Sequence, residues 1–206
     1  MGNEAIVGPG GTQWMFAGRG ITHSERPSKE LAKKGGMNEF IQFWVNAPAK
    51  NKLSPSFYKP ISKEDTPTIE KEGAKIQVIC GEFEGLKGSV QYFIPLDIYR
   101  IEIKEKERLS FSLKEGNNSL IYQLDGALKF DDKMTVAKDM ICFEQSGTEI
   151  EIYAEMDTRF IVLSGQPINE PISKYGPYVM NNQTEIMEAL RDSQMGKMGI
   201  LIEDFD

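Results

Sequence analysis

Residues 99–124 read YRIEIKEKERLSFSLKEGNNSLIYQL and contain three short apolar runs, of which 99–103 and 109–113 alternate apolar with polar residues. A period of two places the apolar side chains on one face of a β-strand. Charged residues and a Gly-Asn-Asn turn sequence separate the runs, as is typical of antiparallel strands joined by turns. Similar apolar runs recur at 40–45, 75–80, 90–94, 140–143, 149–153 and 159–163. The body of the chain is therefore predicted to be all-β and to close as a sandwich or barrel.

The composition excludes some classes of function. The 206 residues include 24 Lys and Arg against 31 Asp and Glu, which gives a formal charge of -7. Because no global positive field is available to hold a polyanion, direct binding to nucleic acid is not expected. We find no apolar stretch long enough for a membrane span and no signal-peptide pattern at the first residues, so we expect a cytoplasmic protein without membrane contact.

Two polar stretches at 24–38 and 46–73 interrupt the rhythm of strands, and their prolines and charges predict surface loops or linkers. A single helix is predicted after the last strand. Asn182 can cap it, and Glu185 stands three residues further on, as in a capping box. The apolar stripe of this helix would consist of Ile186, Ala189 and Leu190.

The two cysteines and two tryptophans are expected to be structural. Cys80 and Cys142 are far apart and lack C-x-x-C spacing, so they are interpreted as buried thiols rather than as a disulfide or a metal site. Trp14 and Trp44 are expected in the core, as large aromatic side chains usually are.

The segment most suggestive of chemistry follows the turn sequence Gly18-Arg19-Gly20, after which a strand is expected to begin at Ile21. His23 and Glu25 come next in an H-x-E arrangement. On a strand these two side chains would point the same way, and a nitrogen and an oxygen donor together suit a divalent transition metal. Taken alone the motif is weak, because His23 is the only histidine in the chain and a firmly held metal needs at least three protein ligands.

A series of motifs gives this segment more weight. Residues 13–25 read QWMFAGRGITHSE, followed in order by QFWVN at 42–46, GQP at 165–167, NEP at 169–171 and YGPYVMN at 175–181. The series spans nearly the whole chain and resembles the pirin family.

The resemblance implies two tandem double-stranded β-helix barrels of the cupin type, the second complete and the first truncated, with one C-terminal helix. Residues 1–46 would be the remnant of the N-terminal cupin domain and 47–72 a linker. Residues 73–165 would form the C-terminal cupin domain, and 166–206 a segment and helix that pack back on the N-terminal part.

The resemblance also implies a metal site. Pirins bind one metal, usually iron, through three histidines and one glutamate, and His23 and Glu25 match the second pair of these ligands. The first pair lies in a histidine-proline-histidine segment for which this sequence has no counterpart. We therefore expect an incomplete site for Fe(II) or another divalent transition metal. The implied activity resembles that of quercetin 2,3-dioxygenase on a flavonol-like substrate, with Glu25 as ligand and catalytic base.

Two other functions stay open. The chain could act without catalysis, as an iron- or redox-responsive co-regulator that works through a protein partner. It could also be an inactive truncated product. Strands removed from a barrel leave unpaired edges, so self-association into a homo-oligomer through exposed strand edges is a further expectation.

Overall fold

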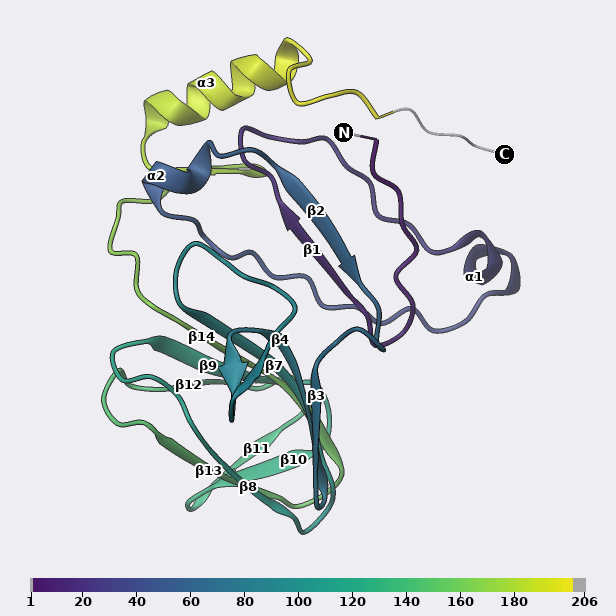
Figure 1. Cartoon of the computed structure of the whole chain (residues 1–206), viewed down its shortest axis with the longest axis vertical. Coiled ribbons are helices and arrows are strands. Elements are labelled where there is room, and N and C mark those ends of the chain that lie inside the picture. Colours follow the sequence, from purple (N-terminus) through teal and green to yellow (C-terminus); the bar gives the residue numbers. More distant parts are fainter. Residues whose placement is uncertain (1, 202–206) are drawn as a thin grey trace. The chain divides into compact units, whose positions relative to one another are not determined.

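The computed structural model describes residues 2–201 of the chain, which divides into two compact units. Unit 1 comprises Met1–Gly8, Gln13–Pro60 and Ile168–Asp206, and unit 2 comprises Pro9–Thr12 and Ile61–Pro167. Figure 1 labels the helices and strands of both units.

Unit 2 is built from two antiparallel sheets (Figure 1). The larger sheet contains β3 (Thr68–Lys71), β4 (Ala74–Cys80), β7 (Leu96–Ile103), β9 (Asn118–Gln123), β12 (Met140–Cys142) and β14 (Thr158–Gly165), in the order β12-β9-β14-β7-β4-β3. The smaller sheet contains β8 (Arg108–Ser112), β10 (Ala127–Phe130), β11 (Lys133–Val136) and β13 (Glu149–Ala154), in the order β11-β10-β13-β8. A short ribbon of β5 (Glu82–Phe83) and β6 (Leu86–Lys87) completes the unit.

One apolar core fills the space enclosed by these sheets. Every second residue of the strands points into it, and the pairing of β14 with β7 over eight residues keeps the apolar positions in register. Burying one such Ile, Val or Phe side chain contributes about 1.5–3 kcal/mol. The core includes Ile76, Val78, Tyr99, Ile101 and Phe160 from the larger sheet and Leu109, Phe111, Leu128 and Ile152 from the smaller one.

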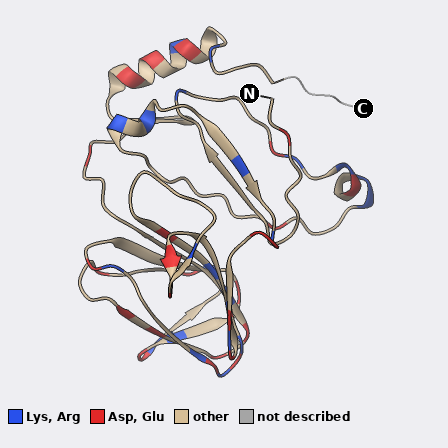
Figure 2. Ribbon diagram, viewed as in Figure 1, with Lys and Arg blue, Asp and Glu red and all other residues tan. Residues whose placement is uncertain are grey.

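Unit 1 contains fewer strands. Its elements are β1 (Thr12–Phe16), α1 (Lys29–Lys34), α2 (Ala49–Lys52), β2 (Phe57–Ile61), β15 (Ser173–Tyr175), β16 (Tyr178–Met180) and α3 (Gln183–Gln194). β1 and β2 form one two-stranded sheet and β15 and β16 another. In Figure 2 the short helix α1 is mainly basic, whereas acidic residues recur along α3.

The predicted helix is present as α3. The Asn182 side chain accepts a hydrogen bond from the Glu185 N–H at 3.0 Å, which confirms the N-cap. The Glu185 carboxylate accepts from the Asn181 N–H at 2.8 Å, so the reciprocal bond forms one residue earlier than in a capping box. Ile186 is 1% exposed and anchors the helix.

The all-β prediction is confirmed, and most of the predicted runs in unit 2 lie in strands β4, β7, β8, β9, β12, β13 and β14. Three strand predictions are wrong. Residues 40–45 and the segment from Ile21 have no strand structure, and residues 90–94 contribute only an isolated bridge between Cys80 and Val90. Alternation supplies strand propensity, but a strand also needs a neighbour to complete its ladder of hydrogen bonds.

Other local predictions need correction. The stretch 24–38 contains α1, and the stretch 46–73 contains α2, β2 and β3, because tertiary packing orders segments whose composition is polar. Cys80 is buried and Cys142 is exposed, and both are free thiols. Trp14 is buried as expected, whereas Trp44 is 62% exposed.

None of the helices formed by residues 2–201 has the length and apolar character needed to cross a bilayer.

Candidate functional site

The candidate site begins at the turn that follows β1. Gly20 N–H donates to the Ala17 carbonyl at 2.9 Å, which confirms the predicted tight turn. Gly18 has a φ of 56°, and a Cβ at this position would lie 2.2 Å from the Ser54 carbonyl oxygen. Only glycine therefore allows the turn to approach the chain so closely.

The chain beyond the turn is held by the C-terminal segment of the same unit. Thr22 N–H donates to the Met198 carbonyl at 2.8 Å, and the Thr22 hydroxyl donates to the Gly199 carbonyl at 3.1 Å. A Cβ on Gly20 would meet the Met198 side chain at 2.4 Å. These contacts fix the backbone immediately before His23 without any strand structure.

Glu25 is exposed but is held by two amide side chains. One carboxylate oxygen, Oε1, accepts a hydrogen bond from Gln13 Nε2 at 3.2 Å, and the other, Oε2, accepts from Gln42 Nε2 at 3.4 Å. Gln13 belongs to β1, where Trp14 and Phe16 are buried and Gln13 points to the opposite face. The carboxylate therefore lies beside the polar face of β1, between segments that are 12 and 17 residues away in sequence.

Tyr58 on β2 is close enough to sense the charge of Glu25. Burial raises the pKa of the Tyr58 hydroxyl, and the negative charge of Glu25 raises it further. Phe57, its neighbour on β2, stacks on Phe16 of β1 with ring centroids 5.6 Å apart. Since successive residues of a strand alternate faces, Tyr58 and Glu25 share the face opposite this aromatic stack.

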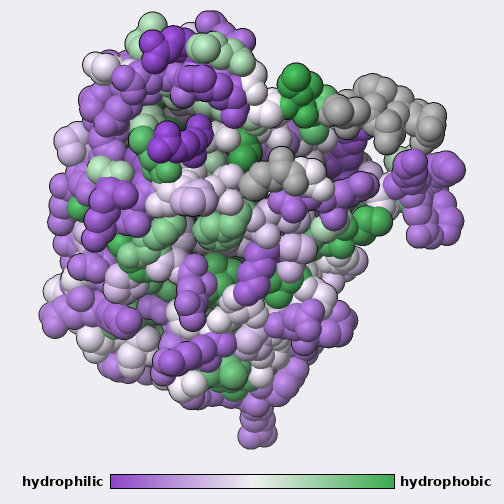
Figure 3. All heavy atoms as spheres, turned by 45° about the horizontal axis from the view of Figure 1, so that its top comes forward, coloured by the Kyte–Doolittle hydropathy of each residue, from purple (hydrophilic) through white to green (hydrophobic). Residues whose placement is uncertain are grey.

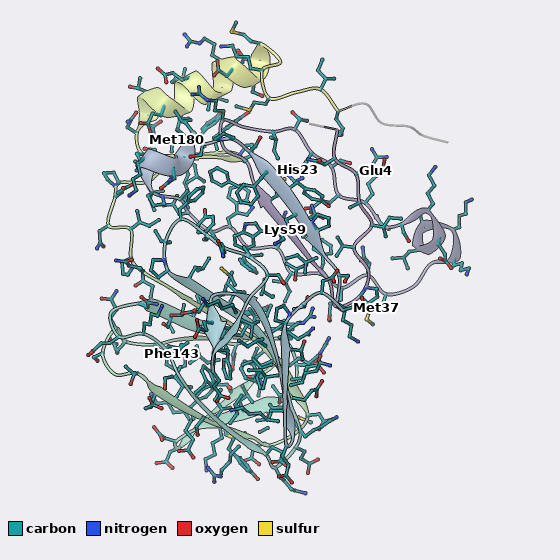
Figure 4. The ribbon with its side chains drawn as sticks, in the orientation of Figure 1. Glu4, His23, Met37, Lys59, Phe143 and Met180 are labelled. Carbon is teal, nitrogen blue, oxygen red and sulfur yellow. The ribbon has the colours of Figure 1, made fainter. Side chains whose placement is uncertain are left out.

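His23 lies two residues before Glu25 and is also exposed. Figure 4 labels its side chain among those drawn in unit 1. Within residues 2–201 no group of three or more His, Cys, Asp or Glu side chains is placed to hold a metal ion. Firmly held catalytic metals have at least three protein ligands. His23 and Glu25 by themselves therefore do not fit a firmly bound resident metal.

A second polar cluster of unit 1, around Glu170, has a structural role that the sequence analysis did not predict. The Glu170 carboxylate accepts from the Ala49 N–H at 2.6 Å and from Asn181 Nδ2 at 3.2 Å. Lys52, which is 7% exposed, donates its Nζ proton to Asn46 Oδ1. Burial lowers the pKa of Lys52, while the nearby charge of Glu170 opposes this shift. Glu170 thus fastens α2 to the C-terminal segment, while Asn181 holds Glu170 and Asn46 holds Lys52.

The interior of unit 2 offers no comparable site. Its inward positions are filled by the apolar core, and the one fully buried amide near Gly126 is satisfied within the protein. Gln123 Nε2 donates to the Gly126 carbonyl at 2.9 Å, and Gln123 Oε1 accepts from the Thr135 hydroxyl at 2.7 Å. Residues 122–126 therefore serve as core and turn, as their alternating pattern indicates.

Comparisons with known proteins agree with this arrangement. The family model described as Pirin matches residues 1–45, and the model described as Pirin C-terminal cupin domain matches residues 98–199. A pirin-like protein of Solanum lycopersicum is 33% identical, and the match covers 96% of this chain and 68% of that protein. The chain belongs to the pirin family.

Two further relatives carry the name of an enzyme. A Pseudomonas aeruginosa pirin relative, named as a candidate quercetin 2,3-dioxygenase, is 36% identical over 97% of this chain and 72% of its own length. The crystal structure of a quercetin 2,3-dioxygenase from Acinetobacter baumannii is 39% identical and superposes with a TM-score of 0.90, covering 94% of this chain and 68% of that one. The prediction of pirin family membership and of an all-β cupin fold is confirmed.

Proposed function

We propose that this pirin contributes His23 and Glu25 to a site for a divalent transition metal, Fe(II) foremost, and that the site serves a flavonol-like substrate. The proposal is supported by the relatives named for quercetin 2,3-dioxygenase and by the H-x-E motif inside the segment that matches the pirin model. The observation that carries it is the fixed position of the Glu25 carboxylate between Gln13 and Gln42.

Glu25 can also act as a general base without a bound metal ion. Its carboxylate is exposed, so the hydroxyl of a bound flavonol can approach it within hydrogen-bonding distance. The hydroxyl proton would pass to a Glu25 oxygen, and the electron pair would stay on the substrate oxygen. The two amide donors hold the carboxylate in place for this transfer.

Metal titration of the purified chain tests the assignment of His23 and Glu25. We expect anaerobic calorimetry with Fe(II) to show weak binding, because two donors replace the usual three or more. His23→Ala and Glu25→Gln should each weaken this binding by at least about tenfold, since even residues that merely orient metal ligands contribute that much. Glu4→Gln makes the same change of carboxylate to amide at an exposed position of unit 1 and should bind as the wild type does.

One result would contradict the proposal, and another would extend it. Equal binding by the wild type, His23→Ala and Glu25→Gln would remove both residues from the metal site. Stoichiometric iron together with oxygen-dependent loss of quercetin absorbance would show that the chain does hold a complete site.

A second candidate function is supported by the surface of unit 1. Met37, Phe40 and Trp44 are 89%, 70% and 62% exposed and lie within eight consecutive residues. Figure 3 shows hydrophobic side chains among hydrophilic ones on the face that it displays. Exposed apolar clusters mark protein-binding surfaces, so we propose non-catalytic self-association through residues 37–44 as the alternative.

A further inference from the structure

We propose that a pocket on the outer face of β3 and β4 binds a small carboxylate, whose oxygen accepts a hydrogen bond from Gln77. The pocket has a volume of about 470 Å³ and is lined by residues 63–68 together with Glu70, Lys75 and Gln77. All of these residues belong to unit 2. The proposal is independent of the function proposed for His23 and Glu25.

The floor of the pocket follows from the strand register. Thr68 pairs with Gln77 and Glu70 pairs with Lys75 between β3 and β4, so these four side chains share one face of the sheet. Ile76 and Val78 alternate with them and point into the apolar core on the other face. The pocket therefore lies outside the barrel, where a ligand can reach it from solvent.

The wall of the pocket is a turn braced by its own side chains. The Ser62 hydroxyl accepts from the Asp65 N–H at 3.0 Å and donates to the Asp65 carboxylate at 2.7 Å. The Thr66 hydroxyl donates to the Ser62 carbonyl at 2.8 Å, and the Ser89 hydroxyl donates to the Asp65 carbonyl at 2.9 Å. The turn is therefore preformed, as is usual for small-molecule sites.

Gln77 is a buried donor whose orientation is fixed. The residue is 2% exposed, and its Oε1 accepts two hydrogen bonds from Arg100, one of them from Nε at 2.8 Å. Rotating the amide by 180° would place its NH₂ group against the guanidinium N–H groups, so the amide cannot invert. Its Nε2 has no hydrogen-bond partner among residues 2–201. A buried donor without a partner is unfavourable, so an acceptor supplied by a ligand would satisfy it.

The lining carries three carboxylates, those of Glu64, Asp65 and Glu70, and two ammonium groups, those of Lys63 and Lys75, so an anionic acceptor is favoured only next to Lys63. Lys75 is already paired with Glu70 at 2.9 Å, and the Asp65 carboxylate accepts a hydrogen bond from the Ser62 hydroxyl and keeps its charge. The Lys63 side chain lies along Gly10, where a Cβ would meet Lys63 Cδ at 3.0 Å. Lys63 forms no ion pair with any residue of the described part of the chain, so its ammonium group is available to a carboxylate that is bound to Gln77.

NMR of the side-chain amides tests the pocket directly. Titration with acetate should shift the Gln77 NH₂ resonance saturably, whereas acetamide, which is neutral and of similar size, should shift it far less. Lys63→Met should weaken acetate binding about two- to fivefold, the loss expected for one partly exposed charge pair. Gln166→Leu changes an exposed glutamine outside the pocket and should leave the titration unchanged.

Gln77→Glu provides the decisive variant. A carboxylate at position 77 can still accept from Arg100, so the fold should persist, but the donor becomes an acceptor that repels acetate. We expect acetate-dependent shifts of the neighbouring backbone amides to vanish in this variant. Shifts that persist in Gln77→Glu, equal responses to acetate and acetamide, or a wild-type Gln77 amide that does not respond to acetate would each overturn the proposal.

Discussion

Replacing Glu170 by Ala should loosen α2 and the C-terminal segment of unit 1. The Glu170 carboxylate accepts two hydrogen bonds, from the Ala49 N–H at 2.6 Å and from Asn181 Nδ2 at 3.2 Å. The Ala49 N–H is at the first position of α2, where no helical carbonyl can accept it. Removing Glu170 therefore leaves a helix terminus without its acceptor.

The size of the effect follows from these contacts. A hydrogen bond to a charged group contributes about 1.5–3 kcal/mol, and the lower value applies here because Glu170 is only half-buried. Two such bonds give a loss of about 3 kcal/mol for Glu170→Ala. Lys52 would also lose the carboxylate whose charge opposes the lowering of its pKa. Glu170→Gln keeps an oxygen acceptor and should lose only about 1 kcal/mol.

Hydrogen–deuterium exchange at the Ala49 amide measures the effect locally. A loss of about 3 kcal/mol corresponds to exchange roughly 100-fold faster in Glu170→Ala, because every 1.4 kcal/mol is tenfold. Glu188→Ala removes an exposed carboxylate from the surface of α3 and is the matched control. If Glu170→Ala and Glu188→Ala exchanged the Ala49 amide at the same rate, the structural role assigned to Glu170 would be refuted.

Two further predictions concern the thiols and the exposed apolar residues. Cys142 is exposed, whereas Cys80 is buried and burial raises the pKa of its thiol to about 11. Ellman's reagent at pH 8 should therefore label one thiol rapidly in the native protein and two after unfolding. Two rapid equivalents in the native protein would show that Cys80 is accessible. If residues 37–44 mediate self-association, sedimentation should show a concentration-dependent dimer that the double variant Phe40→Ser, Trp44→Ser dissociates. Met134→Ser changes an exposed apolar residue of unit 2 and should leave the dimer intact. A wild-type monomer at all concentrations would exclude this surface as a dimer contact.

The sequence identified the core strands of unit 2 because short runs that alternate or are wholly apolar indicate strands that face a core. Residues 75–80, 99–103 and 159–163 were predicted as strands for this reason, and they lie in neighbouring strands of one sheet. Residues 40–45 show a similar pattern but form no strand. The difference lies in the hydrogen-bonding neighbour, which is a distant part of the chain that no local pattern specifies.

The sequence by itself determined the family, the all-β class, the capped helix at Asn182 and the residue types at His23 and Glu25, because each depends on the order of nearby residues. Only the tertiary structure decided which groups surround them. It brought Gln13 and Gln42 to Glu25, Arg100 to Gln77 across 23 residues, and Glu170 to the Ala49 amide across 121 residues. Such partners are set by chain packing, because a contact depends on the distance between two groups in space. The spacing of residues in the local sequence does not specify that distance.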